Sequence, residues 1–337
     1  MKGWILTLFL LPASLPGQLV HFNEVNFTRA DSVARFYGDE DLGDLPALSQ
    51  KLTYALPSQL EKFRAIYTWV CQNIETDYGA YLKNKKKREN LRNKPEELAR
   101  WNHYYVKEVF RKLLKEQKTV CTGYAFLVKQ LAEFSGINCE VVDGYARTYD
   151  ANIHQLGIPN HSWNAVQLNG EWYLCDPSWS SGTIYSMWGT TKFVHEYNQG
   201  YFLTKAAFFI KNHYPLDPSW QLVADTDLED FLEGPLVYSA AFRYGLNPKA
   251  PSRMEIDLVK RDTVLFSLET PADFNPNQLY FEMVDGARSW TIEPKVVHFE
   301  NNLLTLACVF YQSGLYDLHV KIENDFLITY TLNIRKR

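Results

Sequence analysis

The sequence predicts an α+β domain followed by an all-β sandwich. Helical spacing of apolar residues dominates up to about residue 137, and strand-like stretches follow from Asn138 onward. From about residue 234, short alternating runs recur between turn residues, which is typical of a sandwich of about 100 residues. The chain has 337 residues, more than one typical domain. We therefore predict a leader at 1–17, an α+β domain at 22–232 and a β-sandwich at 233–337.

Residues 1–17 have the pattern of a secretory signal peptide. One Lys precedes the apolar run Trp4–Leu11, which ends in Pro and small residues. The run is too short to span a bilayer, and no later segment is apolar enough to do so. We expect export to the periplasm or the medium, and the alternative is a buried N-terminal strand.

Composition excludes several partner classes. A net charge of -4, with 46% apolar and 22% charged residues, gives no reason to expect nucleic acid or an anionic membrane. The five cysteines are too scattered for a zinc motif and too few for a disulfide framework. Their odd number leaves at least one thiol free in an exported chain.

The first strong helical pattern starts at Ser58. Ser58 is a suitable N-cap with Glu61 three residues later, and apolar residues follow at helical spacing, so we predict a helix ending near Asp77.

The next segment, 83–105, is rich in Lys, Arg and Asn. Aromatic residues do not interleave within its basic run, so a solvated insertion is favoured over an anion-binding site.

Cys121 begins the second helical pattern. Apolar residues repeat at intervals of three and four after it, and Ser135-Gly136 ends the pattern. The N-terminus of a helix stabilises a thiolate and offers N–H groups to an oxyanion. A cysteine at this position alone is more often a core residue.

The segment HSWNAVQLNGEWYLCDPSWS contains a β-hairpin around Asn169-Gly170. If Leu168 faces Glu171, the register places His161 and Asp176 on one face as diagonal neighbours, roughly 7 Å apart between backbones. A carboxylate at that distance can orient the imidazole and stabilise its charged form. The hairpin therefore favours a catalytic set of Cys121, His161 and Asp176.

These motifs also resemble the transglutaminase-like superfamily, in particular its bacterial and cytoskeletal branch. The resemblance covers about residues 55–222 and rests on VCTGYAFLVKQLAEFSGI, GYAR, HSWNAVQLNGEWYLCDPSW and the later YFLT…NHYPLDPSWQL. It implies a papain-like core in which a helix carrying Cys121 packs on an antiparallel sheet carrying His161 and Asp176. Cys121 would be the nucleophile, His161 the general base and acid, and Asp176 the residue that orients His161. Thr119 departs from the family, which usually has Gly there.

Other candidate site residues are weaker. We expect Trp163 and Trp179 to line a substrate cleft, although such tryptophans are as often core residues. We expect Gln117 to donate a hydrogen bond to the oxyanion. His154 lacks a carboxylate on a defined opposing strand. His213 precedes Asp217 by four residues, and Pro215 breaks any helix that would align the two. We read the two Asp-Pro-Ser-Trp sequences, at 176–179 and 217–220, as turns followed by a Trp anchor.

The functional expectation is an exported thiol enzyme. It would act on peptide or carboxamide bonds of a protein or peptide substrate through an acyl-enzyme, by hydrolysis or by amide exchange, and it requires no metal or cofactor. We expect the C-terminal domain to be an immunoglobulin-like sandwich that positions substrate or binds a protein partner. The alternative is a non-catalytic scaffold that uses this sandwich for binding.

Overall fold

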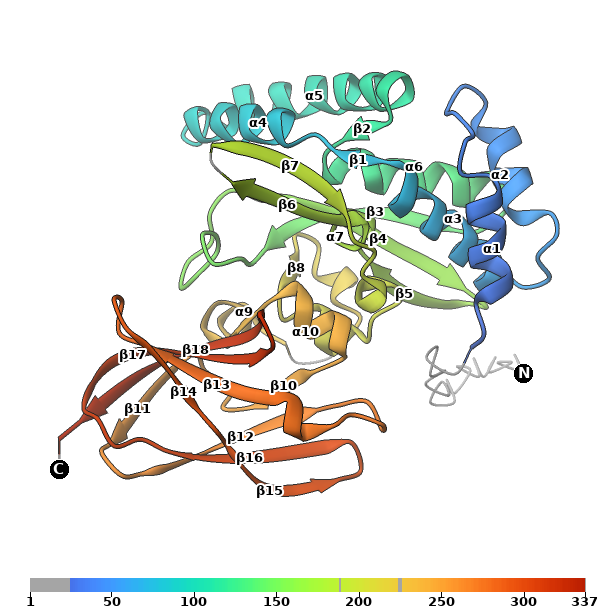
Figure 1. The fold of residues 1–337 in the computed structure, drawn as a ribbon. Helices are drawn as coiled ribbons and strands as arrows, with labels where there is room; N and C mark the ends of the chain where they lie inside the picture. The colour runs from blue at the N-terminus through green and yellow to red at the C-terminus, as the bar shows by residue number, and fades with distance from the viewer. Residues whose placement is uncertain (1–24, 188, 224–225, 337) are drawn as a thin grey trace, which may run out of the picture.

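The computed structural model describes residues 25–187, 189–223 and 226–336. The predicted leader at 1–17 lies outside these residues. The described chain forms an α+β part followed by a region rich in antiparallel strands, as predicted (Figure 1). Within these residues, no helix is both long enough and apolar enough to cross a membrane.

The α+β part is built on a four-stranded antiparallel sheet in the order β5-β4-β3-β8. The helix α6 packs against β3 and β4, and α3 packs against α6. Apolar side chains of α3, α6 and the sheet form one core with the N-terminal helices α1 and α2. The elements are α1 (Thr28–Phe36), α2 (Leu45–Thr53), α3 (Gln59–Asn73), α6 (Cys121–Phe134), β3 (Cys139–Ala146), β4 (His161–Leu168), β5 (Glu171–Cys175) and β8 (His213–Pro215).

The helix predicted from Ser58 is α3, and its cap is reciprocal. The Glu61 N–H donates to Ser58 Oγ at 3.1 Å, and Ser58 Oγ donates to the Glu61 carboxylate at 2.7 Å. The helix ends at Asn73 instead of near Asp77. The reason is that Glu75–Thr76 (β1) leaves the helix to pair in parallel with Lys118–Thr119 (β2).

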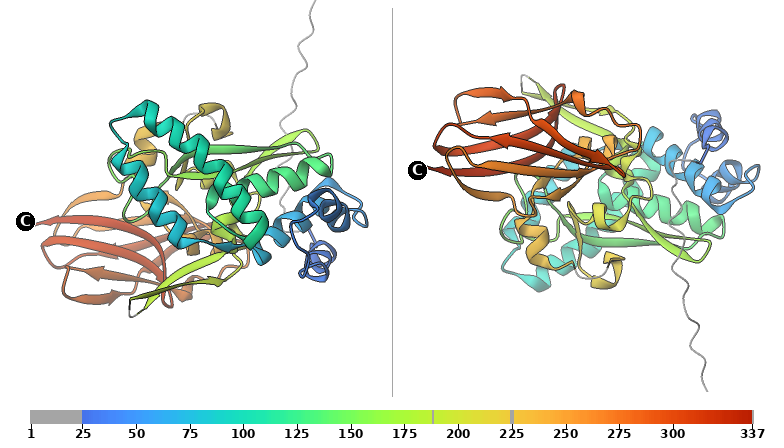
Figure 2. Two further views of the ribbon diagram at one scale, coloured as in Figure 1. Left: turned by 90° about the horizontal axis from the view of Figure 1, so that it is seen from above. Right: turned by 90° about the horizontal axis from the view of Figure 1, so that it is seen from below.

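The basic segment forms a helical hairpin of α4 (Tyr78–Asn90) and α5 (Pro95–Glu116). No residue of α4 is buried, as expected for a solvated insertion. The indole of Trp101 donates to Asn84 at 2.8 Å and ties the two helices together. Figures 1 and 2 show the pair lying side by side at the edge of the α+β part.

Between β5 and the sandwich the chain forms short elements. They are α7 (Pro177–Ser181), β6 (Gly182–Met187), β7 (Thr190–His195), η2 (Gln199–Tyr201), α8 (Ala206–Phe209), η3 (Pro218–Gln221) and α9 (Leu228–Glu233). The segment YFLTKAAFFIKNHYP, one of the strand-like stretches of the sequence, consists mainly of turns and the short helix α8, and only its last three residues are a strand. The predicted boundary at residue 232 falls in α9, and the division into independent domains stays a prediction.

The C-terminal region is a sandwich of two sheets. One has the order β10-β12-β16-β15 and the other β11-β18-β17-β13-β14, with β9 added on β18. The Phe266 ring of the first sheet packs on Phe281 of the second, with ring centroids 5.0 Å apart. Strands β11 and β18 run parallel. The immunoglobulin-like assignment stays a prediction. The elements are β9 (Leu236–Val237), α10 (Ser239–Tyr244), β10 (Asn247–Ala250), β11 (Glu255–Val259), β12 (Thr263–Glu269), η4 (Pro276–Gln278), β13 (Leu279–Val284), β14 (Ser289–Ile292), β15 (Lys295–Glu300), β16 (Leu303–Val309), β17 (Gly314–Ile322) and β18 (Asp325–Arg335).

One apolar cluster joins the two parts of the molecule, and we call it the shared core. It includes Trp163 of β4 and Phe242 of α10 together with Phe266 and Leu306 of the sandwich. The buried guanidinium of Arg147 also spans the connection, donating to the carbonyls of Gly234 and Pro235 at 2.7 and 3.1 Å.

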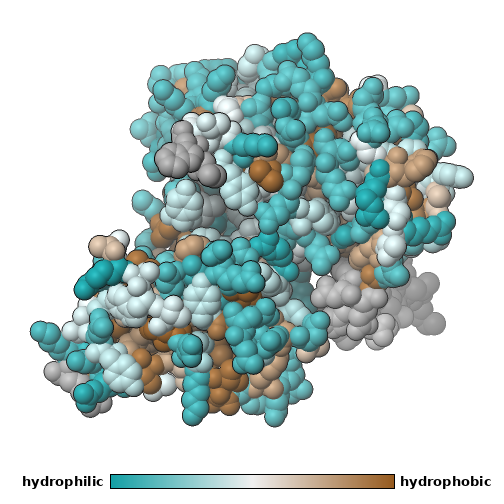
Figure 3. Space-filling view, in the orientation of Figure 1, coloured by the Kyte–Doolittle hydropathy of each residue, from teal (hydrophilic) through white to brown (hydrophobic). Residues whose placement is uncertain are grey.

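Most of the face drawn in Figure 3 is hydrophilic, and hydrophobic residues show mainly over the sandwich.

Candidate active site

Cys121 is the first residue of α6, as the sequence predicts. Its N-cap, Val120, supplies no side-chain acceptor, so the N-terminal N–H groups of α6 keep their partial positive charge close to the thiol. The residue is partly exposed, whereas the other four cysteines are buried. Burial acts to raise the pKa of the Cys121 thiol, but the charge and hydrogen bond of His161 and the N–H of Ser162 outweigh it and lower the pKa. The thiolate is therefore favoured.

The hairpin that carries His161 has the predicted register. Leu168 pairs with Glu171, and the ladder continues to Asn164 and Cys175. It ends there because Asp176 turns the chain into α7. Even so, His161 Nε2 lies 2.7 Å from Asp176 Oδ2. This geometry leaves Nδ1 of His161 without the carboxylate, and the charge of the Cys121 thiolate also acts on the ring.

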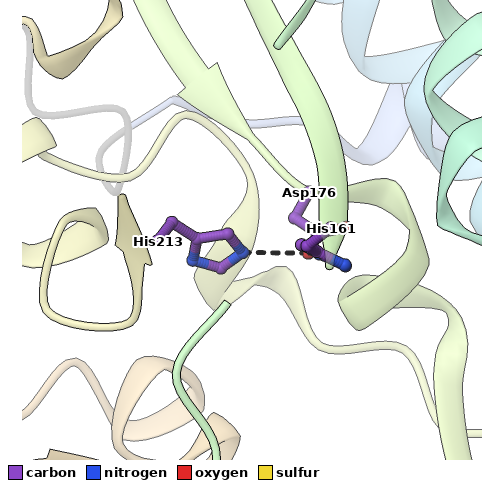
Figure 4. Close-up of side chains that lie close together, drawn as sticks. All are labelled: His161, Asp176 and His213. Carbon is purple, nitrogen blue, oxygen red and sulfur yellow. Dashed lines mark hydrogen bonds and ion pairs between the residues drawn. The ribbon is translucent and has the colours of Figure 1, made fainter. Parts of the chain in front are cut away.

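The carboxylate of Asp176 is fully buried, and both of its oxygens accept hydrogen bonds. Oδ1 accepts from the Ser178 N–H at 2.8 Å, the Ser178 hydroxyl at 2.7 Å and the Trp179 N–H at 3.1 Å. Oδ2 accepts from His161 at 2.7 Å and from His213 at 3.1 Å (Figure 4). Burial opposes ionisation, but the histidines hold the pKa of Asp176 far below its usual range.

The charge of Asp176 acts in turn on His161. Burial of the ring disfavours its charged form, but Asp176 and the Cys121 thiolate reverse this effect and raise the pKa of His161 to about 10. The charged forms of His161 and Cys121 therefore stabilise each other. An ion pair of this kind provides both a nucleophile and a proton donor.

His213 is the residue that sequence reasoning missed. The sequence suggested only a local partner, Asp217, whereas the partner in the structure is Asp176, 37 positions away in sequence. Pairing of β8 with β3 brings His213 opposite Ala146, and β3 also pairs with His161 through Gly144. A histidine within the run FFIKNHYP was the available signal, but only the order of the sheet shows what it faces.

Among the described residues, His161, Asp176 and His213 are the group whose donor atoms could surround a metal ion, all lying within 4.8 Å of one another. Their 2.7 and 3.1 Å contacts are hydrogen-bonding distances. We therefore describe the group as a hydrogen-bonded network.

The three weaker candidates have different positions. Trp179 is half-buried and its ring lies on His161, with centroids 5.0 Å apart. Trp163 is only 1% exposed and belongs to the shared core, so it supports the site from within and the prediction that it lines a cleft is wrong. The amide nitrogen of Gln117 donates to the Glu40 carbonyl at 3.3 Å, so it is engaged away from the predicted oxyanion role.

The departure at Thr119 has a structural explanation. A Cβ atom added at Gly123 would lie 1.8 Å from Thr119 Oγ1, so the threonine side chain fills the space beside the glycine. The first turn of α6 thus accommodates Thr119 because residue 123 has no side chain. The start of α6 is also tied to β4, since the Thr122 and Ser162 hydroxyls lie 3.2 Å apart.

The fold and this site define a class. A helix that begins at a cysteine and packs on an antiparallel sheet carrying a histidine and an aspartate is the papain-like α+β arrangement. Residues 46–177 match the family described as the transglutaminase-like superfamily. This segment of the chain belongs to the superfamily, as its motifs predicted. The matched segment contains Cys121, His161 and Asp176 and ends before His213.

Curated relatives agree with this placement. The chain is 35% identical to the human kyphoscoliosis peptidase over 181 residues, which are 53% of this chain and 24% of that protein. It is 26% identical to hillarin of Drosophila melanogaster, over 68% of this chain and 27% of that protein. It is 23% identical to the LIM and transglutaminase domain protein ltd-1 of Caenorhabditis elegans, over 70% of this chain and 31% of that protein. The matches thus span about a quarter to a third of these relatives.

Proposed function

We propose that this protein is a thiol enzyme in which Cys121, His161 and Asp176 form a catalytic triad that acts on peptide or carboxamide bonds. The observation that carries the proposal is the His161–Asp176 contact of 2.7 Å beside a cysteine whose pKa is lowered by that same histidine. The superfamily match over residues 46–177 supports the assignment of roles.

The proposed reaction proceeds in two stages. The Cys121 thiolate attacks the carbonyl carbon, and N–H groups at the start of α6 stabilise the oxygen that becomes negative. His161 gives its proton to the departing amine, which leaves a thioester on Cys121. His161 then removes a proton from water or from a second amine, which attacks the thioester and releases a carboxylic acid or a new amide.

Asp176 holds His161 in the orientation this sequence requires. Because Nε2 of His161 binds the carboxylate, Nδ1 is the atom that exchanges a proton with the substrate and with sulfur. The carboxylate also favours the imidazolium that forms when the thiol ionises. It remains ionised throughout, since its pKa lies far below the working pH.

Labelling of the thiol tests the proposal directly. We expect iodoacetamide to alkylate Cys121 in the folded protein at pH 7 much faster than any other cysteine. Cys139 is a matched control, because burial raises its pKa and it lies on β3 of the same sheet. Incubation with a peptide library should add an acyl group to Cys121, detected by intact-protein mass spectrometry, and Cys121→Ser should remove the thioester.

The outcome also separates the enzyme from the non-catalytic scaffold. An inert Cys121 would favour the scaffold, in which the sandwich binds a protein partner. Because the human relative is named a peptidase, hydrolysis is the reaction to assay first, followed by amide exchange with an added amine. Export remains a proposal, and sequencing the N-terminus of the secreted protein would test it.

A further inference from the structure

Two imidazole rings share one carboxylate oxygen in this site. Asp176 Oδ2 lies 2.7 Å from Nε2 of His161 and 3.1 Å from Nε2 of His213 (Figure 4). The triad itself needs only the first of these contacts. His213 thus contacts the triad through Asp176, but it lies outside the superfamily match and has no part in the proposed mechanism.

His213 is positioned as firmly as a core residue. It is 1% exposed, and its ring stacks on Phe209 with centroids 4.1 Å apart. Trp179 covers it from another side at 4.6 Å, and Trp163 lies edge-on at 5.1 Å. The ring cannot reach a substrate from this position, so any role it has must act through Asp176.

We propose that His213 is a positioning residue of this site: it donates a hydrogen bond to the carboxylate oxygen that binds His161, fixes that oxygen in place and shares its negative charge. The proposal deepens the proposed function, since its kinetic consequence rests on Cys121 being a nucleophile. The hydrogen bond itself does not depend on catalysis.

The donor role defines the protonation state of His213. A carboxylate oxygen only accepts, so Nε2 must carry a hydrogen. Burial, the strongest influence, lowers the pKa of His213 to about 4, and the ring is neutral at pH 7. The charged or titratable groups that face it are Asp176, His161 and Tyr201. Burial raises the pKa of Tyr201, so that hydroxyl also stays neutral.

A neutral ring with its hydrogen on Nε2 leaves Nδ1 as an acceptor. Asn212 Oδ1 lies 2.6 Å from Nδ1, and Asn212 Nδ2 lies 3.2 Å from the Tyr201 hydroxyl. The oxygen and nitrogen of a side-chain amide are assigned from their partners and exchange places when the amide is turned over. The tautomer with hydrogen on Nε2 requires the turned amide, in which the NH₂ group donates to Nδ1 and the oxygen accepts from the Tyr201 hydroxyl. In that orientation Asn212 supports the tautomer that lets His213 donate to Asp176.

Removal of this donor should change how Asp176 acts on His161. With one hydrogen bond fewer, the carboxylate attracts the His161 imidazolium more strongly, which favours the Cys121 thiolate at lower pH. The carboxylate is also free to rotate, so the orientation of His161 becomes less defined. A loss of this kind in supporting residues costs roughly 10- to 100-fold in activity at metal sites, and we expect the lower end here.

The experiment compares His213→Phe with His213→Gln. Phe keeps an aromatic ring on Phe209 but lacks the donor, whereas the Gln amide nitrogen reaches about as far as Nε2. In His213→Phe we expect the acid limb of the pH profile for the rate of Cys121 alkylation to move to lower pH by about half a pH unit. Turnover should fall about ten-fold. His213→Gln should return the limb toward the wild-type position. A folded His213→Phe variant whose limb matches wild type would overturn the inference.

A measurement on the unaltered protein shows whether His213 can donate to Asp176, independently of activity. Nitrogen-15 NMR of the labelled histidines, assigned with His213→Gln, reports which ring nitrogen carries hydrogen. We expect His213 to remain neutral with its hydrogen on Nε2 from pH 5 to 9, and a hydrogen on Nδ1 alone or on both nitrogens would overturn the inference. A Cys121 with an ordinary thiol pKa would instead overturn the proposed function, and the NMR result would still decide the role of His213.

Discussion

The sequence Asp-Pro-Ser-Trp occurs twice, at 176–179 and 217–220, and the two copies fold alike locally. In both, the aspartate caps a short helix that begins at the proline. Its Oδ1 accepts from the serine N–H, at 2.8 Å in the first copy and 2.9 Å in the second. Each tryptophan then packs on another ring, Trp179 on His161 and Trp220 on Trp172.

The copies differ in what surrounds the second carboxylate oxygen. Asp176 is fully buried and its Oδ2 accepts from two histidines, whereas Asp217 is exposed. The pKa of Asp217 is lowered mainly by the Ser219 N–H, and no histidine contributes. Four residues therefore specify the turn, and the tertiary environment decides whether its aspartate takes part in chemistry.

Replacing the aspartates should give the largest contrast. Asp176→Asn keeps the shape of the turn but removes the charge that orients His161, and we expect turnover to fall by roughly 10³- to 10⁴-fold. Asp217→Asn should leave turnover within about two-fold, because its site is exposed. Steady-state kinetics on an amide substrate measures both. Equal losses in the two variants would contradict the contrast.

The pH dependence of turnover sharpens the same contrast. His161 has a pKa raised to about 10, so its proton is present below that pH and is lost above it. Activity should therefore fall on an alkaline limb centred near pH 10, by about ten-fold one unit beyond it. In Asp176→Asn the limb should move to lower pH, whereas in Asp217→Asn it should not move. An unchanged limb in Asp176→Asn would show that another group titrates.

The tryptophans offer a smaller effect. Trp179→Leu removes the ring that lies on both His161 and His213, so we expect turnover to fall by roughly two- to twelve-fold, since such ring contacts contribute about 0.5–1.5 kcal/mol. Trp220→Leu should reduce stability without changing kcat. Kinetics combined with urea unfolding separates the two effects, and a kcat loss in Trp220→Leu would argue against a local role for Trp179.

The serines test the same contrast through stability. The buried Ser178 hydroxyl donates to Asp176 at 2.7 Å, and loss of a hydrogen bond to a charged group costs about 1.5–3 kcal/mol, so Ser178→Ala should lower the free energy of unfolding by about 2 kcal/mol. Ser219→Ala, at an exposed position, should stay within about 0.5 kcal/mol of wild type. Urea denaturation of both variants provides the values.

The features that followed from local sequence were predicted well. The Ser58 cap, the start of α6 at Cys121 and the hairpin register around Asn169-Gly170 each depend on neighbouring residues only, and the structure has all three. The contact between His161 and Asp176 was predicted from that register and is present, although the ladder itself ends one residue earlier, at Cys175. The sequence alone thus brought two of the three proposed catalytic side chains together.

What could not be predicted depends on contacts between distant segments. His213 reaches Asp176 because β8 lies beside β3, and strand order cannot be read from alternation. Trp163 is buried because Phe209 of α8 and His213 of β8 pack on its ring, which a pattern of aromatics does not reveal. The end of α3 at Asn73 likewise depends on pairing with a strand more than 40 residues later.

The shared core has a mechanical consequence for the whole chain. Trp163 is the second residue after His161 on β4, and the same cluster includes Phe242, Phe266 and Leu306. Cutting the chain after α9 would remove Phe242 from the ring of Tyr201, which packs on His213, so the N-terminal part is a poor candidate for isolated expression. A substitution deep in the sandwich, more than a hundred residues past Cys121, can therefore loosen the reactive centre without touching it.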